Sequence, residues 1–234
     1  RKPDREIEIR DLFTHTSGIT YGFLMQGEVD KLYRQEKIGR PDETLEECCI
    51  RIAKLPLLFS PGTRWNYGHS TDVLGRVVEV ASGMTLDAFF RERIFGPLGM
   101  SDTDFYVPEE KLSRLMACYN RDPVSGEVTV SDGAGDASKA YRTQPPMLNA
   151  GGGLVSTLRD YHRFCLMLLH GGSLDGARLL SPKTVEFMRM NHLPGNQTIK
   201  QMGDLTFSES RMEGNGFGLG GSTITNVAET TQPG

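Results

Sequence analysis

The sequence predicts an α+β protein in which helices fill most of the chain and strand structure appears only near the C-terminus. Apolar residues recur at helical spacing behind N-capping residues through about the first four-fifths of the 234 residues. An alternating, strand-like pattern appears only over residues 217–227. We therefore expect one incomplete domain over residues 1–234, with helices and loops over about 1–210 and the first strand of a sheet over about 211–234.

Six helices are predicted in chain order from capping residues and stop signals. They begin at or just after residues 6, 44, 70, 85, 157 and 181, and end before Gly18, Pro56, Gly83, Gly96, Gly171 and about residue 190. Thr44 with Glu47, and Thr157 with Asp160, have the spacing of capping boxes, in which two side chains satisfy backbone amides of the first turn. Between residues 101 and 153 we expect turns and one strand at 127–130.

The composition excludes several classes of function. With 26 basic and 30 acidic residues the formal charge is −4, and no basic run is present, so we expect no nucleic-acid partner. Every apolar run is far shorter than the roughly 18 residues that cross a bilayer, so we expect no membrane span. The 4 cysteines form no C-x-x-C pattern, which argues against a zinc site or a redox dithiol.

Two further motifs are better explained by structure than by chemistry. Residues 216–221 satisfy G-x-G-x-x-G, but a strand-like run follows them where a dinucleotide site needs a helix, so glycines in a bent strand are expected. His15 and Ser17 are only two residues apart at a helix end. We expect them to shape a turn and to bind backbone groups rather than to form a catalytic pair.

Five segments in sequence order resemble the serine β-lactamase-like superfamily. They read IRDLFTHTSG from Ile9, PGTRWNYGHS from Pro61, DVLG from Asp72, FGPLGM from Phe95 and GGGLVST from Gly151. The similarity is greatest to the class C-related, family VIII carboxylesterases, which also resemble penicillin-binding proteins and D-alanyl-D-alanine peptidases. The resemblance extends from about residue 7 to 226. It implies a β-lactamase-like fold, here mostly the helical part with the start of an antiparallel sheet.

The resemblance also implies a serine hydrolase with a covalent acyl-enzyme. In this family the nucleophile is the serine of an S-x-x-K motif, and the lysine and a tyrosine assist, because a serine hydroxyl is a weak nucleophile until a base takes its proton. Tyr67 matches the family's tyrosine and is the candidate catalytic residue; whether tyrosine or lysine is the base stays open. His69, Gly152 and Gly153 are the candidate substrate-binding residues. The resemblance implies no metal and no cofactor.

Two departures from the family pattern bear on the substrate. His69 stands where β-lactamases and peptidases have Asn, and an imidazole does not reproduce the paired donor and acceptor of an amide. Small esters are therefore favoured over β-lactams or peptides. No S-x-x-K occurs in the 234 residues, so we expect the nucleophile upstream of Arg1, a K-T-G or H-x-G strand beyond Gly234, and no activity from this chain alone. The alternatives are a β-lactamase or D-alanyl-D-alanine peptidase, and a non-catalytic relative that binds a ligand.

Overall fold

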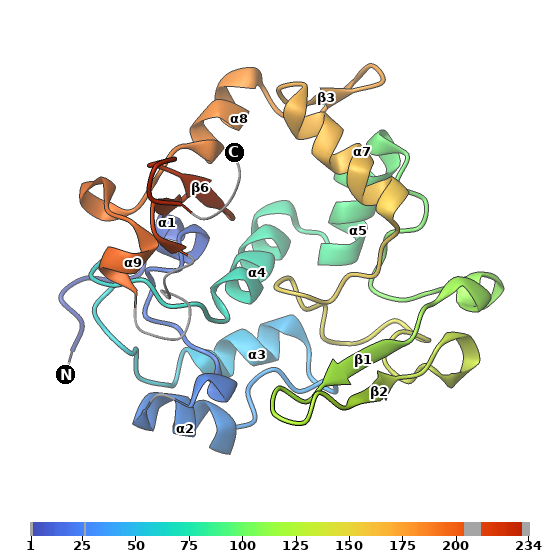
Figure 1. Ribbon diagram of the computed structural model, residues 1–234, viewed down its shortest axis with the longest axis horizontal. Coiled ribbons are helices and arrows are strands. Elements are labelled where there is room, and N and C mark those ends of the chain that lie inside the picture. The colour runs from blue at the N-terminus through green and yellow to red at the C-terminus, as the bar shows by residue number, and fades with distance from the viewer. Residues whose placement is uncertain (1, 26, 204–211, 231–234) are drawn as a thin grey trace.

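A computed structural model describes residues 2–25, 27–203 and 212–230 and shows helices arranged around a central one (Figure 1). The central helix, α4, packs against α1, α3 and α5. The described helices are α1 (Ile9–Phe13), α2 (Glu28–Gln35), α3 (Leu45–Ile52), α4 (Ser70–Ser82), α5 (Leu86–Phe90), α6 (Gly96–Leu98), α7 (Leu158–Leu169), α8 (Pro182–Arg189) and α9 (Ile199–Met202). A π-helical turn (Arg91–Phe95) joins α5 to α6, and short 3-10 turns cover Gly22–Leu24, Glu109–Arg114, Gly135–Ala137 and Pro194–Asn196.

Three predicted helices form where their local signals place them. The capping box of α3 is present, since the Thr44 hydroxyl accepts from the Glu47 amide and the Glu47 carboxylate accepts from the Thr44 amide. Helix α4 ends at Gly83, whose φ of 69° is the left-handed conformation that glycine adopts without strain. Helix α8 begins with Ser181 as its N-cap and a proline in its first turn.

Two details of the predicted helices are wrong. Thr157 caps α7, but the carboxylate of Asp160 does not return the bond; it accepts instead from the amide of Asp102 and the hydroxyl of Thr103. The helical path from α5 also does not stop at Gly96. It continues through the π-helical turn and α6, which includes Pro97, and ends at Gly99, where φ is 63°.

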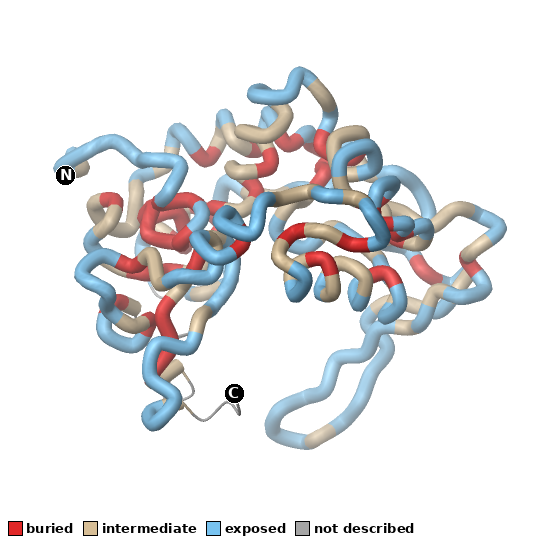
Figure 2. The backbone as a smooth tube through the Cα atoms, turned by 90° about the horizontal axis from the view of Figure 1, so that it is seen from above, coloured by how far each residue is buried: buried red, intermediate tan, exposed pale blue. Residues whose placement is uncertain are grey.

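In the part of the chain that the structure describes, the strands form three separate antiparallel pairs. They are β1 (Cys118–Arg121) with β2 (Val128–Asp132), β3 (Ser173–Leu174) with β4 (Ala177–Arg178), and β5 (Asn215–Phe217) with β6 (Ser222–Ile224). β2 confirms the strand expected at 127–130. Its partner β1 was not predicted, and both strands belong to the exposed hairpin that extends from the body in Figure 2.

The C-terminal strand region is a hairpin rather than one strand. Gly218 donates its amide to Gly221, so residues 218–221 form the turn between β5 and β6, and the bent strand expected for the glycine-rich segment is wrong for these residues. At Gly216 an added Cβ would lie 2.4 Å from the side chain of Asn191, so this strand passes close to the segment that follows α8. Residue 211 and residues 231–234 of the expected strand region, and the expected boundary near residue 210, lie outside the described residues.

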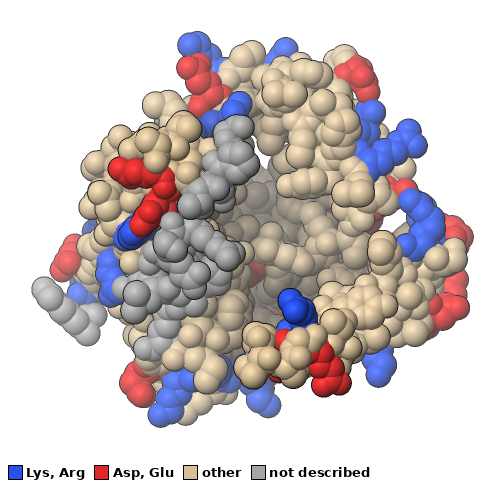
Figure 3. All heavy atoms as spheres, in the orientation of Figure 1, with Lys and Arg blue, Asp and Glu red and all other residues tan. Residues whose placement is uncertain are grey.

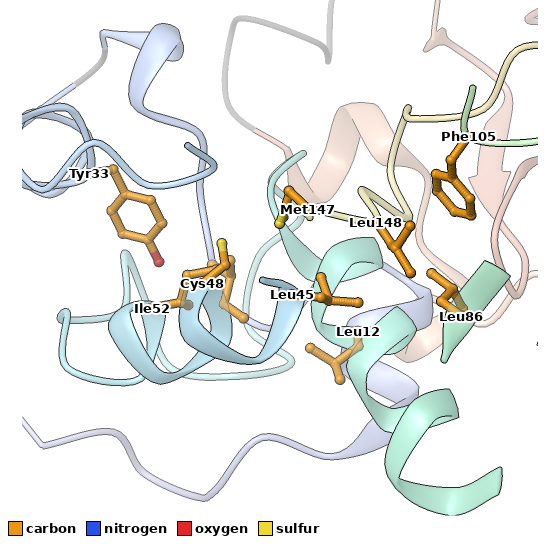
Figure 4. Packing of buried hydrophobic residues seen from close by; sticks show 10 residues of the cluster. Leu12, Tyr33, Leu45, Cys48, Ile52, Leu86, Phe105, Met147 and Leu148 are labelled. Carbon is orange, nitrogen blue, oxygen red and sulfur yellow. The ribbon is translucent and has the colours of Figure 1, made fainter. Parts of the chain in front are cut away.

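The main hydrophobic core lies between α1, α3, α4 and the loop that precedes α7 (Figure 4). Its buried members are Leu12, Ile19, Tyr33, Leu45, Cys48, Ile52, Leu86, Phe105, Met147 and Leu148. A second core joins α6 to α7, and a small third cluster holds Trp65 against α9. Tyr67 and Phe217 pack on this third cluster, so the candidate site lies at its edge. Within the described parts of the chain, no helix combines the length and the apolar character that crossing a membrane requires.

Candidate active site

The loop that carries Tyr67 is fixed by backbone contacts on both sides. The amide of Trp65 donates to the backbone of α9 at 3.0 Å, and the side-chain amide of Asn66 donates to the carbonyl of Ile19 at 3.3 Å. At Gly68 an added Cβ would lie 2.3 Å from the same carbonyl oxygen. Only glycine allows this approach, and the position of Tyr67 is therefore determined by the neighbouring segment as well as by its own loop.

Tyr67 lies in a row of aromatic and imidazole rings. Its half-buried ring has its centroid 4.8 Å from that of His15 and 5.4 Å from that of Tyr21. Tyr21 in turn stacks on Phe23 at 4.8 Å, with the two planes 21° apart. Aromatic pairs at these separations hold one another in fixed orientations, so the phenol of Tyr67 is oriented by neighbours from two other segments.

His69 is buried and held by an aspartate. It is the N-cap residue of α4 and is 7% exposed, and its Nδ1 lies 2.8 Å from Oδ2 of Asp72, which is fully buried. The other carboxylate oxygen, Oδ1, accepts from the amide of Gly151 at 3.0 Å. The Tyr21 ring meets the imidazole edge-on at 4.3 Å. The structure thus brings Tyr67 and His69 into one cluster, with Tyr21 between them.

Gly152 and Gly153 belong to the tight turn that begins at Asn149. The amide of Gly153 donates to the Asn149 carbonyl at 2.9 Å, and an added Cβ at Gly153 would lie 2.7 Å from that oxygen. Gly152 is exposed, and the nearest atom to an added Cβ there is 3.9 Å away. The structure joins this turn to the Tyr67 cluster through Gly151 and Asp72, while Gly152 and Gly153 themselves lie further along the turn.

Burial sets the protonation of two groups in this cluster. It lowers the pKa of His15 to about 4, which the charge of Asp72 opposes only in part. It also raises the pKa of the Tyr21 phenol above its usual range, and the charge of Asp72 acts in the same direction. At neutral pH the Tyr67 ring therefore lies between a neutral imidazole and a protonated phenol.

Ser17 has the structural role expected for it. It is fully buried, accepts from the amide of Ile19 at 3.1 Å, and shares a 2.8 Å hydrogen bond with the hydroxyl of Ser70 at the start of α4. His15 has a φ of 55° and lies in the turn as predicted, but its Nδ1 is buried without a hydrogen-bond partner. Its ring contact with Tyr67 was not predicted.

The sequence reasoning missed Tyr21 and Asp72. A signal for Asp72 was present, because residues three apart at the start of a helix face each other, and His69 and Asp72 have this spacing. Tyr21 had no comparable signal, since its contacts come from chain segments far away in the sequence. Among the described residues, no three His, Cys, Asp or Glu side chains gather as metal ligands.

The face of the molecule drawn in Figure 1 is hollowed at its centre, where α4 lies (Figure 3). Tyr67 precedes the first residue of α4 by three positions. The loop that carries Tyr67 therefore leads directly into the helix that lies at the centre of this hollow.

Comparison with known proteins gives relatives over nearly the whole chain. Protein Rv1367c from Mycobacterium tuberculosis is 39% identical over 227 residues, which cover 97% of this chain and 53% of that protein. Lovastatin esterase from Penicillium rubens is 35% identical over 193 residues, 82% of this chain and 46% of the esterase. This chain thus spans about half the length of the curated relatives it matches.

Solved structures and a family model agree with these relatives. EstCE1, described as a hydrolase with promiscuous acyltransferase activity, aligns with a TM-score of 0.73 at 26% identity, over 97% of this chain and 59% of its own. The fold predicted from the five sequence segments is confirmed by this alignment. The family model described as Beta-lactamase matches residues 1–227. The chain belongs to the beta-lactamase family.

Proposed function

We propose that the protein carrying this chain is a serine hydrolase that forms an acyl-enzyme and cleaves small carboxylic esters, with Tyr67 in proton transfer. The observation that carries the proposal is the fixed, half-buried loop that holds Tyr67 at the start of α4, in the sequence context of the family's catalytic tyrosine. The names of two relatives, a lovastatin esterase and a hydrolase with acyltransferase activity, support ester chemistry. The proposal requires the serine and lysine of an S-x-x-K motif, which does not occur within these 234 residues.

The proposed reaction has two steps. In the first, the serine oxygen attacks the ester carbonyl, its proton passes to the base, and the alcohol leaves with a proton returned by Tyr67 or the lysine. In the second, water attacks the acyl-enzyme by the same route and releases the acid. A phenol with an unperturbed pKa near 10 acts as a base at about pH 7.5 only if some 3.4 kcal/mol favours its charged form, and an adjacent ammonium supplies such a bias.

The environment of His69 supports esters over amides. In β-lactamases and peptidases the Asn at this place offers both a donor and an acceptor to a peptide-like group. Here Nδ1 of the imidazole is engaged by Asp72 and the residue is 7% exposed. The remaining imidazole edge does not offer an amide-like pair. A small-molecule ester is therefore the proposed substrate, with no nucleic-acid partner and no cofactor.

The test uses the full-length protein with p-nitrophenyl esters and nitrocefin as substrates. We expect ester cleavage, and we expect Tyr67→Phe to lower kcat by about 10²-fold or more, as for the loss of a general acid or base. Tyr161→Phe, which makes the same change at an exposed position of α7, is the control and should keep the wild-type kcat. Rapid nitrocefin turnover with negligible ester cleavage would favour the β-lactamase alternative. Ligand binding without turnover of either substrate would favour the non-catalytic one.

A further inference from the structure

One buried carboxylate connects the two segments that flank the candidate site. Asp72 accepts from His69, three residues before it, through Oδ2 and from the amide of Gly151, 79 residues after it, through Oδ1. Asp72 has no exposed surface, and each of its two carboxylate oxygens has a hydrogen-bond partner within the protein. The loop that ends at His69 and the turn that contains Gly151 are held at a fixed separation by this single side chain.

The position of Asp72 in its helix does not by itself account for this arrangement. An acidic residue in the first turn of a helix is favourable at the surface, where water solvates its charge. Burying a carboxylate costs several kcal/mol unless donors replace the lost water. At Asp72 one donor is the imidazole of His69, the N-cap residue of the same helix, and the other is the amide of Gly151 from a distant segment. Both donors belong to parts of the chain that carry candidate site residues.

Tyr21 connects this carboxylate to the candidate catalytic phenol. Its ring lies edge-on against His69 at 4.3 Å and contacts the ring of Tyr67 at 5.4 Å. Its hydroxyl also lies beside the turn, since an added Cβ at Gly151 would be 3.2 Å from it and 3.4 Å from Oδ1 of Asp72. Asp72, His69, Tyr21 and Gly151 therefore form one packed unit, which we call the Asp72 unit, against one side of Tyr67.

We propose that Asp72 is a positioning residue for the reaction. By binding His69 and Gly151 it holds Tyr21 against Tyr67 and sets the distance between the phenol and the turn over residues 151–153. This inference rests on the proposed function of Tyr67. Asp72 touches no reacting atom in this scheme, so its loss is expected to affect kcat through the placement of Tyr67 more than it affects KM.

The chain offers a matched control in Asp160. This residue is also an aspartate in the first turn of a helix and is 2% exposed, and its carboxylate also accepts from a distant backbone amide, that of Asp102, at 2.7 Å. In the full-length enzyme both Asp72→Ala and Asp160→Ala should lower the Tm. We expect Asp72→Ala to reduce kcat by about ten-fold or more with KM within about three-fold, and Asp160→Ala to keep kcat within about two-fold, because small misplacements of catalytic groups are costly.

Either of two results would overturn the proposal: a folded Asp72→Ala enzyme with wild-type kcat, or an equal loss of kcat in Asp160→Ala. A second pair of variants decides the question if Asp72→Ala does not fold. Asp72→Asn keeps the size of the side chain and one oxygen that accepts from the amide of Gly151, but an NH2 group replaces the oxygen that accepts from His69. Asp160→Asn is the matched control. We expect kcat about ten-fold lower or more in Asp72→Asn and within about two-fold of wild type in Asp160→Asn; a wild-type kcat in Asp72→Asn would contradict the inference.

Tyr67→Phe separates this inference from the proposed function. Full activity in Tyr67→Phe removes Tyr67 from the mechanism, and the proposed function fails with it. Loss of activity in Tyr67→Phe together with wild-type kcat in Asp72→Ala and Asp72→Asn means that only the positioning role fails. Loss of activity in all three, with Asp160→Ala and Asp160→Asn active, supports both.

Discussion

The region around Tyr67 and the core between α6 and α7 are stabilised in different ways. Near Tyr67 many of the buried residues are polar and form directed hydrogen bonds: Ser17 bonds to Ser70, and His69 bonds to Asp72. The side chain of Asn66 donates to the carbonyl of Ile19. Between α6 and α7 the buried cluster is apolar, with Phe95, Leu98, Met100, Met167 and Leu174. Hydrogen bonds impose direction, whereas apolar contacts are non-directional. We therefore expect the first region to fix the orientation of its side chains and the second region to contribute most to the free energy of unfolding.

The largest change in the free energy of unfolding is expected from a substitution in the apolar region, and it tests this comparison directly. Met167 is 1% exposed and packs in the cluster between α6 and α7. Met167→Ala should lower the free energy of unfolding by about 2–5 kcal/mol, through lost burial and the cavity left behind. Denaturant unfolding of the full-length protein measures this loss, and ester kinetics should show kcat unchanged below the transition. A large fall in kcat under conditions where Met167→Ala is fully folded would contradict the distinction between the two regions.

A smaller change in the free energy of unfolding is expected when the pH is lowered, because acid acts on the buried His15 of the polar region. The unfolded chain protonates His15 with a pKa near 6.5, whereas the folded pKa is about 4. Between these values the unfolded state binds more protons, so stability falls as the pH drops from about 6.5 to 4 and this contribution is constant below that. The loss amounts to about 3 kcal/mol at most, from 1.36 kcal/mol per pKa unit.

The measurement is the free energy of unfolding at pH 7 and at pH 4.5 for wild type and His15→Asn. Asparagine tolerates the left-handed backbone of this position and does not titrate in this range. The variant should lose less stability on acidification than the wild type does. His162→Asn, at an exposed position of α7, is the control and should follow the wild type. Equal pH dependence in wild type and His15→Asn would contradict the buried, neutral imidazole.

The smallest effect is expected in the hairpin of β1 and β2, which belongs to neither region. Val128 is 60% exposed and pairs with Arg121 across the hairpin. Val128→Thr should change the free energy of unfolding by less than about 0.5 kcal/mol, as for surface substitutions in general. Thermal unfolding and ester kinetics should both match wild type. A loss of several kcal/mol would mean that this hairpin is covered in the full-length protein.

The sequence predicted those parts of the molecule whose signals are local. Helices α3 and α8 begin at their own capping residues and α4 ends at its glycine, and the five matched segments led to the fold and to Tyr67. Helix α2 was missed because its inward residues, Asp30 and Tyr33, are not an apolar stripe. Asp30 is buried because it accepts from Thr20 at 2.8 Å, a contact that no spacing rule predicts.

The candidate site shows the same division between local and distant signals. The pairing of His69 with Asp72 has helical spacing, and sequence reasoning had access to it. The bond from Asp72 to Gly151 joins positions 79 residues apart, and Tyr21 reaches His69 and Tyr67 only through the folded path of the chain. Such contacts are products of tertiary packing. The roles assigned to Tyr67, His69, Gly152 and Gly153 remain predictions that the kinetic experiments test.

The glycines of the site differ in what protein engineering could do with them. Gly68 has a carbonyl oxygen 2.3 Å from where a Cβ would stand, so a mutant library at this codon would consist largely of misfolded members. Gly152 has open space around it and an ordinary backbone φ. A diversified codon at position 152 would therefore yield mostly folded members, so side chains can be varied at this position without disturbing the packing around Gly68.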